Sequence, residues 1–323
     1  RDYLADFASG EGGSRRYLQS MASLSQSGVY GNLEGDWALV TQHQQDLLLT
    51  SNASTLQILP RLEGQLLWYA HPNLTFGLEH QTTRFDRRLG VDGLRMDLHP
   101  FIEIPWELAG GDISATLHAG SHHTRYWLKQ QANNSSANPF RTSGEVSLEV
   151  RSDFEGINSD RTWRHAISPI LRYDFINVPD QSSLPNFDST FGLLAWSNLM
   201  SGNRFSGFDR VEKANRFSLI LENRLQHKSD PETAATDFLV IRGGASYNLQ
   251  RQSIDAALKP AATRPFSNLL GEVIFQPASG IYLFSSGQYN TVDRYWATLS
   301  SAISLSAASG NNLMVSHQLT DAR

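Results

Sequence analysis

Residues Leu94 to Trp106 read LRMDLHPFIEIPW, and every second residue of this segment is apolar. The intervening positions include Arg95, Asp97 and Glu103. A two-residue period predicts a β-strand with one dry face and one wet face. The segment is longer than an ordinary strand of ~5–6 residues and slightly longer than the ~9–11 residues that cross a bilayer at a tilt. Length and pattern together favour a membrane-spanning strand.

The same alternation recurs along the whole chain, and the sequence predicts about fourteen strands and no helix. The predicted strands are 17–24, 37–40, 56–68, 74–81, 94–106, 113–119, 145–151, 163–175, 216–225, 239–249, 269–275, 281–289, 297–305 and 313–319. We therefore expect an all-β chain, and specifically part of an antiparallel transmembrane β-barrel that is larger than these strands alone.

The connections between the predicted strands alternate in length. Short links at 28–32, 70–73, 107–111 and 277–280 take turns with longer ones at 43–54, 129–141, 176–214 and 250–265. Outer-membrane barrels have short turns on the periplasmic rim and long loops on the other rim. The segment 290–293 breaks the rule, because it is short where a long loop is due. The alternation of short and long connections still favours a barrel over a β-sandwich.

Aromatic residues fall near the ends of the predicted strands, where barrels place them at both lipid–water borders. The residues concerned are Trp37, Trp68, Tyr69, Trp106, Tyr126, Trp127, Trp163, Phe175 and Trp296. Rings that cap a soluble core would give a similar pattern.

Composition agrees with a barrel and excludes some other classes. Charged residues make up 18% of the chain, the net charge of −5 comes from mixed signs, and there are no cysteines. Nothing resembles the basic surface of a nucleic-acid binder, and neither disulfides nor thiolate metal sites can form within these residues. No apolar run approaches the ~18 residues of a membrane-spanning helix. A secreted β-sandwich fits this composition almost as well.

The two ends of the sequence lead us to expect a piece of a longer chain. It opens at Arg1 with no Met and no signal-like segment, and it stops at Arg323 directly after a predicted strand.

One long connection, 177–213, has no two-residue period. Its central part, with the start of the next strand, reads LPNFDSTFGLLAWSNLMSGNRFSGFDRVEKANR from Leu184 to Arg216. This stretch carries too many large apolar groups for a solvated linker, so we expect a functional loop that packs on a dry surface. Asp188 and Asp209 lack the regular ligand spacing of a calcium loop and are expected to pair with Arg204 and Arg210.

Two polar clusters could be drawn as reactive sites, but neither has a diagnostic spacing. One is His122, His123 and Tyr126, and the other is Asp97, His99 and Glu103. Polar groups on a wet barrel face explain both clusters. No local signature marks the activated serine of a hydrolase. We therefore predict no catalytic residue, no metal site and no cofactor.

The loop motifs LPNFDS, NRFSGFDR and ANR resemble the signature of the LptD family, the lipopolysaccharide-assembly proteins of the Gram-negative outer membrane. The preceding HAISPILRYDF is similar to that family's segment, with His165, Pro169 and Tyr173 at matching offsets. Asp2 to Phe7, the LPRL beginning at Leu59 and the TRYWL of Thr124 to Leu128 follow in the family's order. The resemblance covers most of the chain.

The resemblance implies a translocon that inserts lipopolysaccharide into the outer leaflet, with no covalent step. Sugars would pass through a polar lumen and acyl chains would leave through a lateral gate into membrane lipid. The family also has a periplasmic jellyroll that receives lipopolysaccharide from bridge proteins, and closing strands beyond this segment. On this reading residues 1–323 are one barrel fragment in the outer membrane, and both gate strands lie outside it.

The resemblance also assigns roles to two sets of residues. The polar lumen would be lined by Arg61, Glu63, Arg95, Asp97, Glu145, Glu149, Arg216, Glu222 and Arg224. In this family a plug lipoprotein, LptE, sits inside the barrel. The long loop would pack on that plug or cap the outer mouth through Pro185, Phe187, Asp188, Trp196, Asn203, Arg204, Phe205, Gly207, Asp209 and Arg210.

Three alternatives stay open from the sequence. A passive or substrate-specific outer-membrane channel for small solutes would conduct steadily without a plug. A soluble carbohydrate-binding sandwich or propeller would fold without detergent, although the sequence lacks the repeats expected of propeller blades. An outer-membrane hydrolase is the third alternative.

Overall fold

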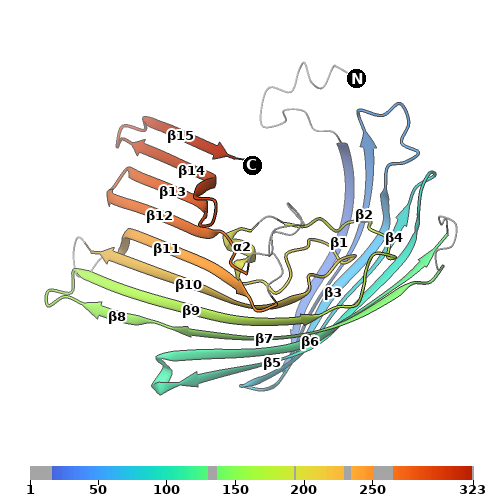
Figure 1. Cartoon of the computed structure of the whole chain (residues 1–323), viewed down its shortest axis with the longest axis horizontal. Coiled ribbons are helices and arrows are strands. Elements are labelled where there is room, and N and C mark those ends of the chain that lie inside the picture. Colours follow the sequence, from blue (N-terminus) through green and yellow to red (C-terminus); the bar gives the residue numbers. More distant parts are fainter. Residues whose placement is uncertain (1–16, 130–136, 193, 229–233, 251–264, 322–323) are drawn as a thin grey trace.

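The computed structural model describes residues 17–129, 137–192, 194–228, 234–250 and 265–321, and these form one curved antiparallel sheet (Figure 1). The Asp2 to Phe7 segment and Leu193 lie outside the described residues. The strands are β1 (Tyr17–Tyr30), β2 (Leu33–Asp46), β3 (Gln57–His71), β4 (Leu74–Asp86), β5 (Gly93–Leu108), β6 (Ile113–Leu128), β7 (Phe140–Ser152), β8 (Phe154–Ile157), β9 (Trp163–Asn177), β10 (Ala214–His227), β11 (Thr236–Asn248), β12 (Leu269–Ala278), β13 (Ile281–Asn290), β14 (Tyr295–Ser306) and β15 (Asn312–Thr320).

Each strand pairs with its neighbours in sequence, except that the short β8 pairs only with β9, beside the main path. Every predicted strand coincides with one observed strand, so the all-β antiparallel prediction is confirmed. The sequence analysis missed β8, because four residues that follow β7 after a single aspartate are too short to show a period. The path of the sheet runs from β1 to β15, and within the described residues these two edge strands are not paired with each other. The sheet is therefore an open segment of a barrel.

The two faces of the sheet are opposite in character to those of a soluble protein. On β5, Arg95, Asp97 and His99 are buried on the concave face, which carries the long loop (Figure 1). On the convex face aliphatic side chains stand exposed, and Leu219 and Leu221 of β10 keep about half of their surface accessible, 50% and 48%. Polar groups inside and apolar groups outside are what a strand needs when its outer face meets lipid. Such a sheet is typical of an outer-membrane barrel and not of a sandwich core.

The aromatic residues at the strand ends mostly follow the predicted pattern. Trp37, Trp68, Trp106 and Trp296 are exposed, with accessible fractions of 37% to 48%. Tyr126 is the exception, because its side chain is fully buried on the concave face. Its neighbour Trp127 is exposed, as two successive strand residues must point to opposite faces. The expectation that both rings belong to a lipid-border girdle is therefore wrong for Tyr126.

The long connections lie together on one rim, because they alternate with short turns along a sheet whose neighbours follow the sequence. The long ones are 47–56, 129–139, 178–213 and 249–268, and the short ones are 31–32, 72–73, 109–112 and 279–280. Gly280 shows why one short turn needs glycine. Its φ is +84°, and a Cβ there would lie 2.1 Å from the carbonyl oxygen of Ser306.

Helical structure among the described residues is confined to α2 (Trp196–Leu199) and the 3-10 turn η1 (Ala109–Gly111). Asn198 stabilises the start of α2, since its Oδ1 accepts the Ala195 N–H at 2.8 Å. None of the helices in the described ranges has the length and apolar composition needed to cross a membrane.

Candidate functional site

The connection between β9 and β10, residues 178–213, lies along the concave face of the sheet (Figure 1). We refer to it as the β9–β10 loop. It carries the motifs that distinguish this chain from a generic barrel, and three groups of contacts hold it on the wall. Two attachments lie far apart, one on β4 to β7 and the other on β10 to β13, and a third group fixes the middle of the loop to β10.

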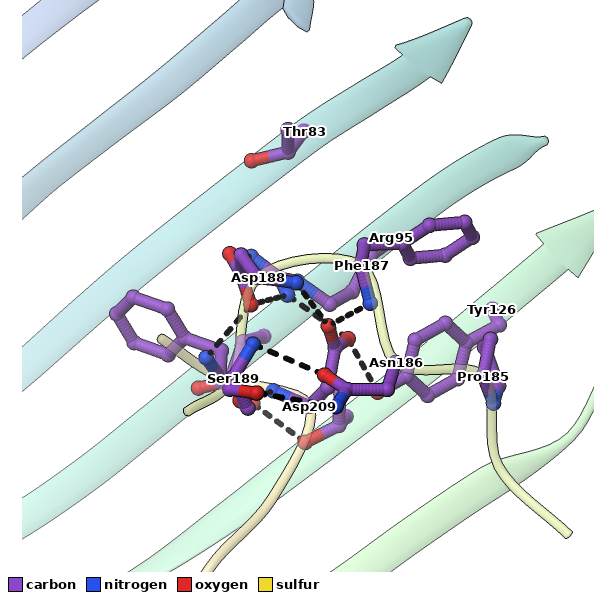
Figure 2. A network of polar contacts seen from close by, with 12 residues as sticks. Thr83, Arg95, Tyr126, Pro185, Asn186, Phe187, Asp188, Ser189 and Asp209 are labelled. Atoms are coloured by element: carbon purple, nitrogen blue, oxygen red, sulfur yellow. Dashed lines mark hydrogen bonds and ion pairs between the residues drawn. The ribbon is translucent and has the colours of Figure 1, made fainter. Parts of the chain in front are cut away.

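Arg95 of β5 holds the first of these attachments (Figure 2). Its two terminal nitrogens donate to both oxygens of Asp188, each at 2.7 Å, and Nη1 also donates to Oδ1 of Asp209 at 2.8 Å. Nη2 donates further to Gln81 of β4 at 2.6 Å. The side chain of Arg95 is 0% exposed, so the loop is tied to the wall by a fully desolvated guanidinium. A bidentate arginine–carboxylate pair is among the strongest and most directional polar contacts.

Asp209 is the centre of this network within the loop. Its Oδ2 accepts the backbone N–H groups of Phe187 and Asp188, at 2.6 and 2.9 Å, and Oδ1 also accepts the hydroxyl of Tyr126 at 2.9 Å. Arg141 of β7 donates to the carbonyl oxygens of Phe208 and Asp209, at 2.8 and 2.9 Å. The two loop segments 184–189 and 205–210 are thus joined to each other and to three strands.

Arg95 is the cation that both carboxylates contact directly. Burial opposes ionisation of Asp188, yet the hydrogen bonds and charge of Arg95 outweigh burial and hold the pKa of that carboxyl below its usual value. At Asp209 burial dominates and raises the pKa, even though Arg95 acts in the opposite direction. Removing Arg95 would therefore take away the one cation that is hydrogen-bonded to the buried Asp209 carboxylate among the described residues.

Close packing accompanies the polar contacts. The ring of Phe187 stacks on Phe85 of β4 with centroids 4.3 Å apart, and the Arg95 guanidinium lies 5.4 Å from the centroid of Phe208. Gly207 has a φ of +68°, and a Cβ there would lie 2.4 Å from Oδ1 of Asp188. Only glycine permits the loop to turn this close to the carboxylate.

The second attachment is apolar and surrounds α2. Leu194 and Leu199 of the loop form a buried cluster with Leu270 of β12, against which Trp196 packs. The Arg242 guanidinium lies 5.4 Å from the Trp196 ring, and Gln288 of β13 donates a hydrogen bond to the carbonyl of Leu194. The apolar residues at this end of the loop are therefore packed on an apolar part of the wall, as the composition of the loop predicts.

A third group of contacts fixes the middle of the loop to β10. Oε1 of Glu212 accepts a hydrogen bond from Nη2 of Arg204 at 2.7 Å and lies 3.0 Å from Nη1 of Arg216. Arg216 in turn donates to the carbonyls of Ser201 and Gly202, at 2.5 and 2.9 Å. Asn203 accepts the N–H groups of Phe205 and Glu212 through Oδ1, at 3.1 and 3.0 Å. Phe191 and Phe205 meet edge to face at 5.0 Å and are only partly buried.

The structure corrects one detail of the predicted loop. The shared cation of Asp188 and Asp209 is Arg95 on the wall, so the expected pairing with Arg204 and Arg210 is wrong about the partner. Arg204 pairs with Glu212, and Arg210 donates to the carbonyls of Leu184 and Pro185, both at 2.8 Å. A cation that lies 93 residues before Asp188 in the sequence leaves no local signal.

Strand register places all nine predicted lumen residues on the face that carries the loop. Arg61, Thr83 and Arg95 are paired in one row across β3 to β5, and Glu63, Gln81 and Asp97 form the next row. Glu145 and Glu149 share a face of β7 with Arg141, and Glu222 and Arg224 share a face of β10 with Arg216. Ion pairs link many of these groups, as in Arg172–Glu149 at 3.3 Å and Arg224–Asp237 at 2.7 Å.

Sequence reasoning missed several residues of the network: Gln81, Phe85, Thr124, Arg141 and Gln181. Thr124 donates to Asp97 at 2.5 Å, and Arg141 donates to Thr124 at 2.6 Å and to Gln181 at 2.9 Å. The alternation does place Arg95 and Asp97 on a wet face, whereas Arg141 falls in the predicted connection 129–141 and proves to lie near the start of β7. Which of them meet across strands depends on register, which periodicity leaves undetermined.

A curved sheet with a lipid-compatible outer face, a polar inner face and an inward loop defines an outer-membrane β-barrel protein. The profile described as "LptD: LPS transport system D" matches residues 1–322. The chain belongs to the LptD family, and its place is the outer membrane of Gram-negative bacteria.

Three curated relatives, each named LPS-assembly protein LptD, illustrate the similarity. The Nitrosospira multiformis protein is 33% identical over 46% of this chain and 16% of its own length. The Nitrosomonas europaea protein is 31% identical over 54% of this chain and 25% of its own length. The Shewanella oneidensis protein is 25% identical over 83% of this chain and 35% of its own length. The chain thus matches about a third or less of each of these relatives.

Among solved structures, Pseudomonas aeruginosa FpvA bound to pyoverdine overlaps 94% of this chain and 47% of its own, with a TM-score of 0.38 and 11% identity. Similarity at this level carries no functional information.

Proposed function

We propose that these residues form the middle portion of a barrel that inserts lipopolysaccharide into the outer leaflet of the outer membrane. The observation that carries the proposal is the Arg95 network. Asp188 and Asp209, which it joins, are in the two motifs, LPNFDS and NRFSGFDR, that resemble the LptD family most specifically. The family motif therefore encodes a loop held on the polar wall, where it would border the path of a passing sugar chain.

Translocation through such a wall needs no covalent step. The ion-paired polar face offers a hydrated path for sugars and phosphates, and the exposed aliphatics of the convex face match lipid acyl chains. The same proposal includes a plug lipoprotein, LptE, against the concave face, bridge proteins that deliver the lipid from the periplasm, and a lateral gate formed by strands outside this segment.

The main alternative is a channel for small solutes, and photocrosslinking separates the two. Glu149 and Leu148 lie on opposite faces of β7, in the half nearer the short-turn rim. A photoreactive amino acid would replace each residue in turn in the intact protein, and cells would be pulsed with labelled lipopolysaccharide precursor. The translocon predicts labelled lipopolysaccharide adducts at position 149 and few at 148, where phospholipid is the neighbour. A solute channel predicts no adduct at position 149.

A further inference from the structure

A histidine–carboxylate cluster lies on the concave wall at mid-height, beside the Arg95 network, which it meets at Asp97. His99 of β5, His118 of β6 and Glu145 of β7 each offer one ligand atom, and these atoms all lie within 4.8 Å of one another. Nε2 of His99 and Nε2 of His118 both face Oε1 of Glu145, at 2.9 and 3.1 Å. Three adjacent strands therefore direct two imidazole nitrogens and one carboxylate oxygen to a single point.

Nε2 of His118 is within hydrogen-bond distance of Oε1 of Glu145, but the geometry at His99 suits a cation better than a hydrogen bond. Nε2 of His99 is buried and has no hydrogen-bond partner in acceptable geometry, although the Glu145 oxygen is near. Ligands of a tetrahedral zinc ion, bound at ~2.0–2.2 Å, stand ~3.3 Å from one another. Each nitrogen would therefore need to move away from the Glu145 oxygen by only a few tenths of an ångström to admit the metal. An unsatisfied nitrogen pointing at a carboxylate oxygen marks the position that an ion would fill.

The opposite side of each imidazole is arranged as in known metal sites. Nδ1 of His99 lies 3.0 Å from Oε2 of Glu79, and Nδ1 of His118 lies 3.4 Å from Oε1 of Glu103. A metal-bound histidine usually gives its other N–H to a carboxylate, which fixes the tautomer and makes the ligand nitrogen more basic. His122 stacks on His99 with centroids 3.8 Å apart, which holds the ligand ring in its plane.

The charge around the cluster and its access to solvent also favour a bound cation. Glu79, Glu103, Glu145 and Asp97 surround the three imidazoles, so the cluster has excess negative charge whenever the imidazoles are neutral. It also borders a cavity of about 490 Å³, which residues 201–203 of the β9–β10 loop line on the other side. A fourth coordination position is therefore open to water or to an anionic group.

We propose that His99, His118 and Glu145 bind a divalent transition-metal ion, with zinc as the best match to two imidazoles and one carboxylate. The ion would join β5, β6 and β7 and offer a cationic point on the polar wall beneath the loop. Magnesium and calcium, which prefer all-oxygen sites, would bind poorly.

The test uses the intact protein, purified in detergent with an affinity tag that contains no histidine, stripped with chelator and then dialysed against Zn²⁺ or Co²⁺. We expect about one equivalent of Zn²⁺ per chain, and visible absorption of four-coordinate Co²⁺ that Zn²⁺ displaces. His99→Asn and Glu145→Gln should abolish both signals. Glu79→Gln should keep the site but weaken affinity about 10- to 100-fold. Because Glu79→Gln leaves all three ligands in place, binding that is weakened but not abolished in this variant separates the loss of a ligand from general misfolding.

The matched control is His123→Asn, which removes the exposed neighbour of His122 on the convex face. It should bind metal as the parent does. Two results would overturn the proposal: a parent protein that retains no Zn²⁺ and gives no Co²⁺ absorption, or metal binding that His99→Asn and Glu145→Gln leave unchanged.

Discussion

Arg95 and Asp209 form an ion pair in which both side chains are 0% exposed, although 114 residues separate them in the sequence. Asp209 belongs to the loop motif and Arg95 to the wall, so this contact turns a sequence signature into a fixed position for the loop. The β9–β10 loop is consequently part of the inner surface of the barrel segment.

Arg95→Ala should detach this end of the loop. The substitution removes the cation that is hydrogen-bonded to the buried Asp209 carboxylate, and breaking one partner of a buried pair costs about 3–5 kcal/mol. We expect a lower urea midpoint for unfolding in detergent and rapid protease cleavage within 184–210. The control is Arg84→Ala, since Arg84 is partly exposed and lies 4.0 Å from Asp86, a pair that contributes at most about 1 kcal/mol. Equal effects of the two substitutions would contradict the assignment.

Gly207→Ala should strain the same attachment without touching a charge. The new Cβ meets Oδ1 of Asp188 at 2.4 Å in a left-handed backbone conformation, so either the turn or the carboxylate must move. We expect a loss of about 1–3 kcal/mol and faster proteolysis of the loop. Gly271→Ala on β12 is the comparison, because a Cβ there has nothing within 4 Å. Protease resistance equal to that of the parent would show that the turn is not constrained.

Trp196→Ala should loosen the second attachment independently of the first. The ring packs on the Leu194, Leu199 and Leu270 cluster, and truncating a large, half-buried aromatic costs about 2–4 kcal/mol. The Arg95 and Trp196 contacts share no residue, so their effects should add to within about 0.5 kcal/mol in the double variant. A coupling energy well above that value would mean that the loop is held as one unit.

Phe205→Glu tests the proposed contact with a plug. Phe205 is partly buried and lies on no strand of the wall, which makes it a better probe than Trp196, whose ring is already covered by this chain. We expect reduced co-purification of the plug lipoprotein from detergent extracts, because a charge would replace an apolar contact. Ser182→Glu, at an exposed position of the same loop, should leave recovery unchanged. Full recovery with Phe205→Glu would count against a plug contact there.

The sequence predicted the strands well because alternation is a local property. The period of two over 94–106 and its repeats placed fourteen strands and separated the wet residues from the dry ones. The orientation of Tyr126 was predicted wrongly because two adjacent aromatics near a strand end look alike in sequence, whereas the pleat of the strand points only one of them toward lipid.

Most contacts of the β9–β10 loop with the wall could not be predicted from local sequence patterns. The motif residues Asp188 and Asp209 were recognised, but their cation on β5 depends on how a long loop folds back across the sheet. The same limit applies to the histidine cluster. His99, His118 and Glu145 are on three strands, and only the register brings their side chains to one point.

Spin-label accessibility along β5 measures whether the apolar face of the strands meets lipid. The chain has no cysteine, so single cysteines can be introduced from Leu94 to Trp106 and labelled with a nitroxide in the intact protein in bilayers. We predict a two-residue period in which labels at 98, 102 and 104 relax with oxygen dissolved in lipid. Labels at the neighbouring odd positions should respond less to oxygen and, where the loop leaves room, to a water-soluble nickel reagent. Loss of the period, or the opposite phase, would contradict the account.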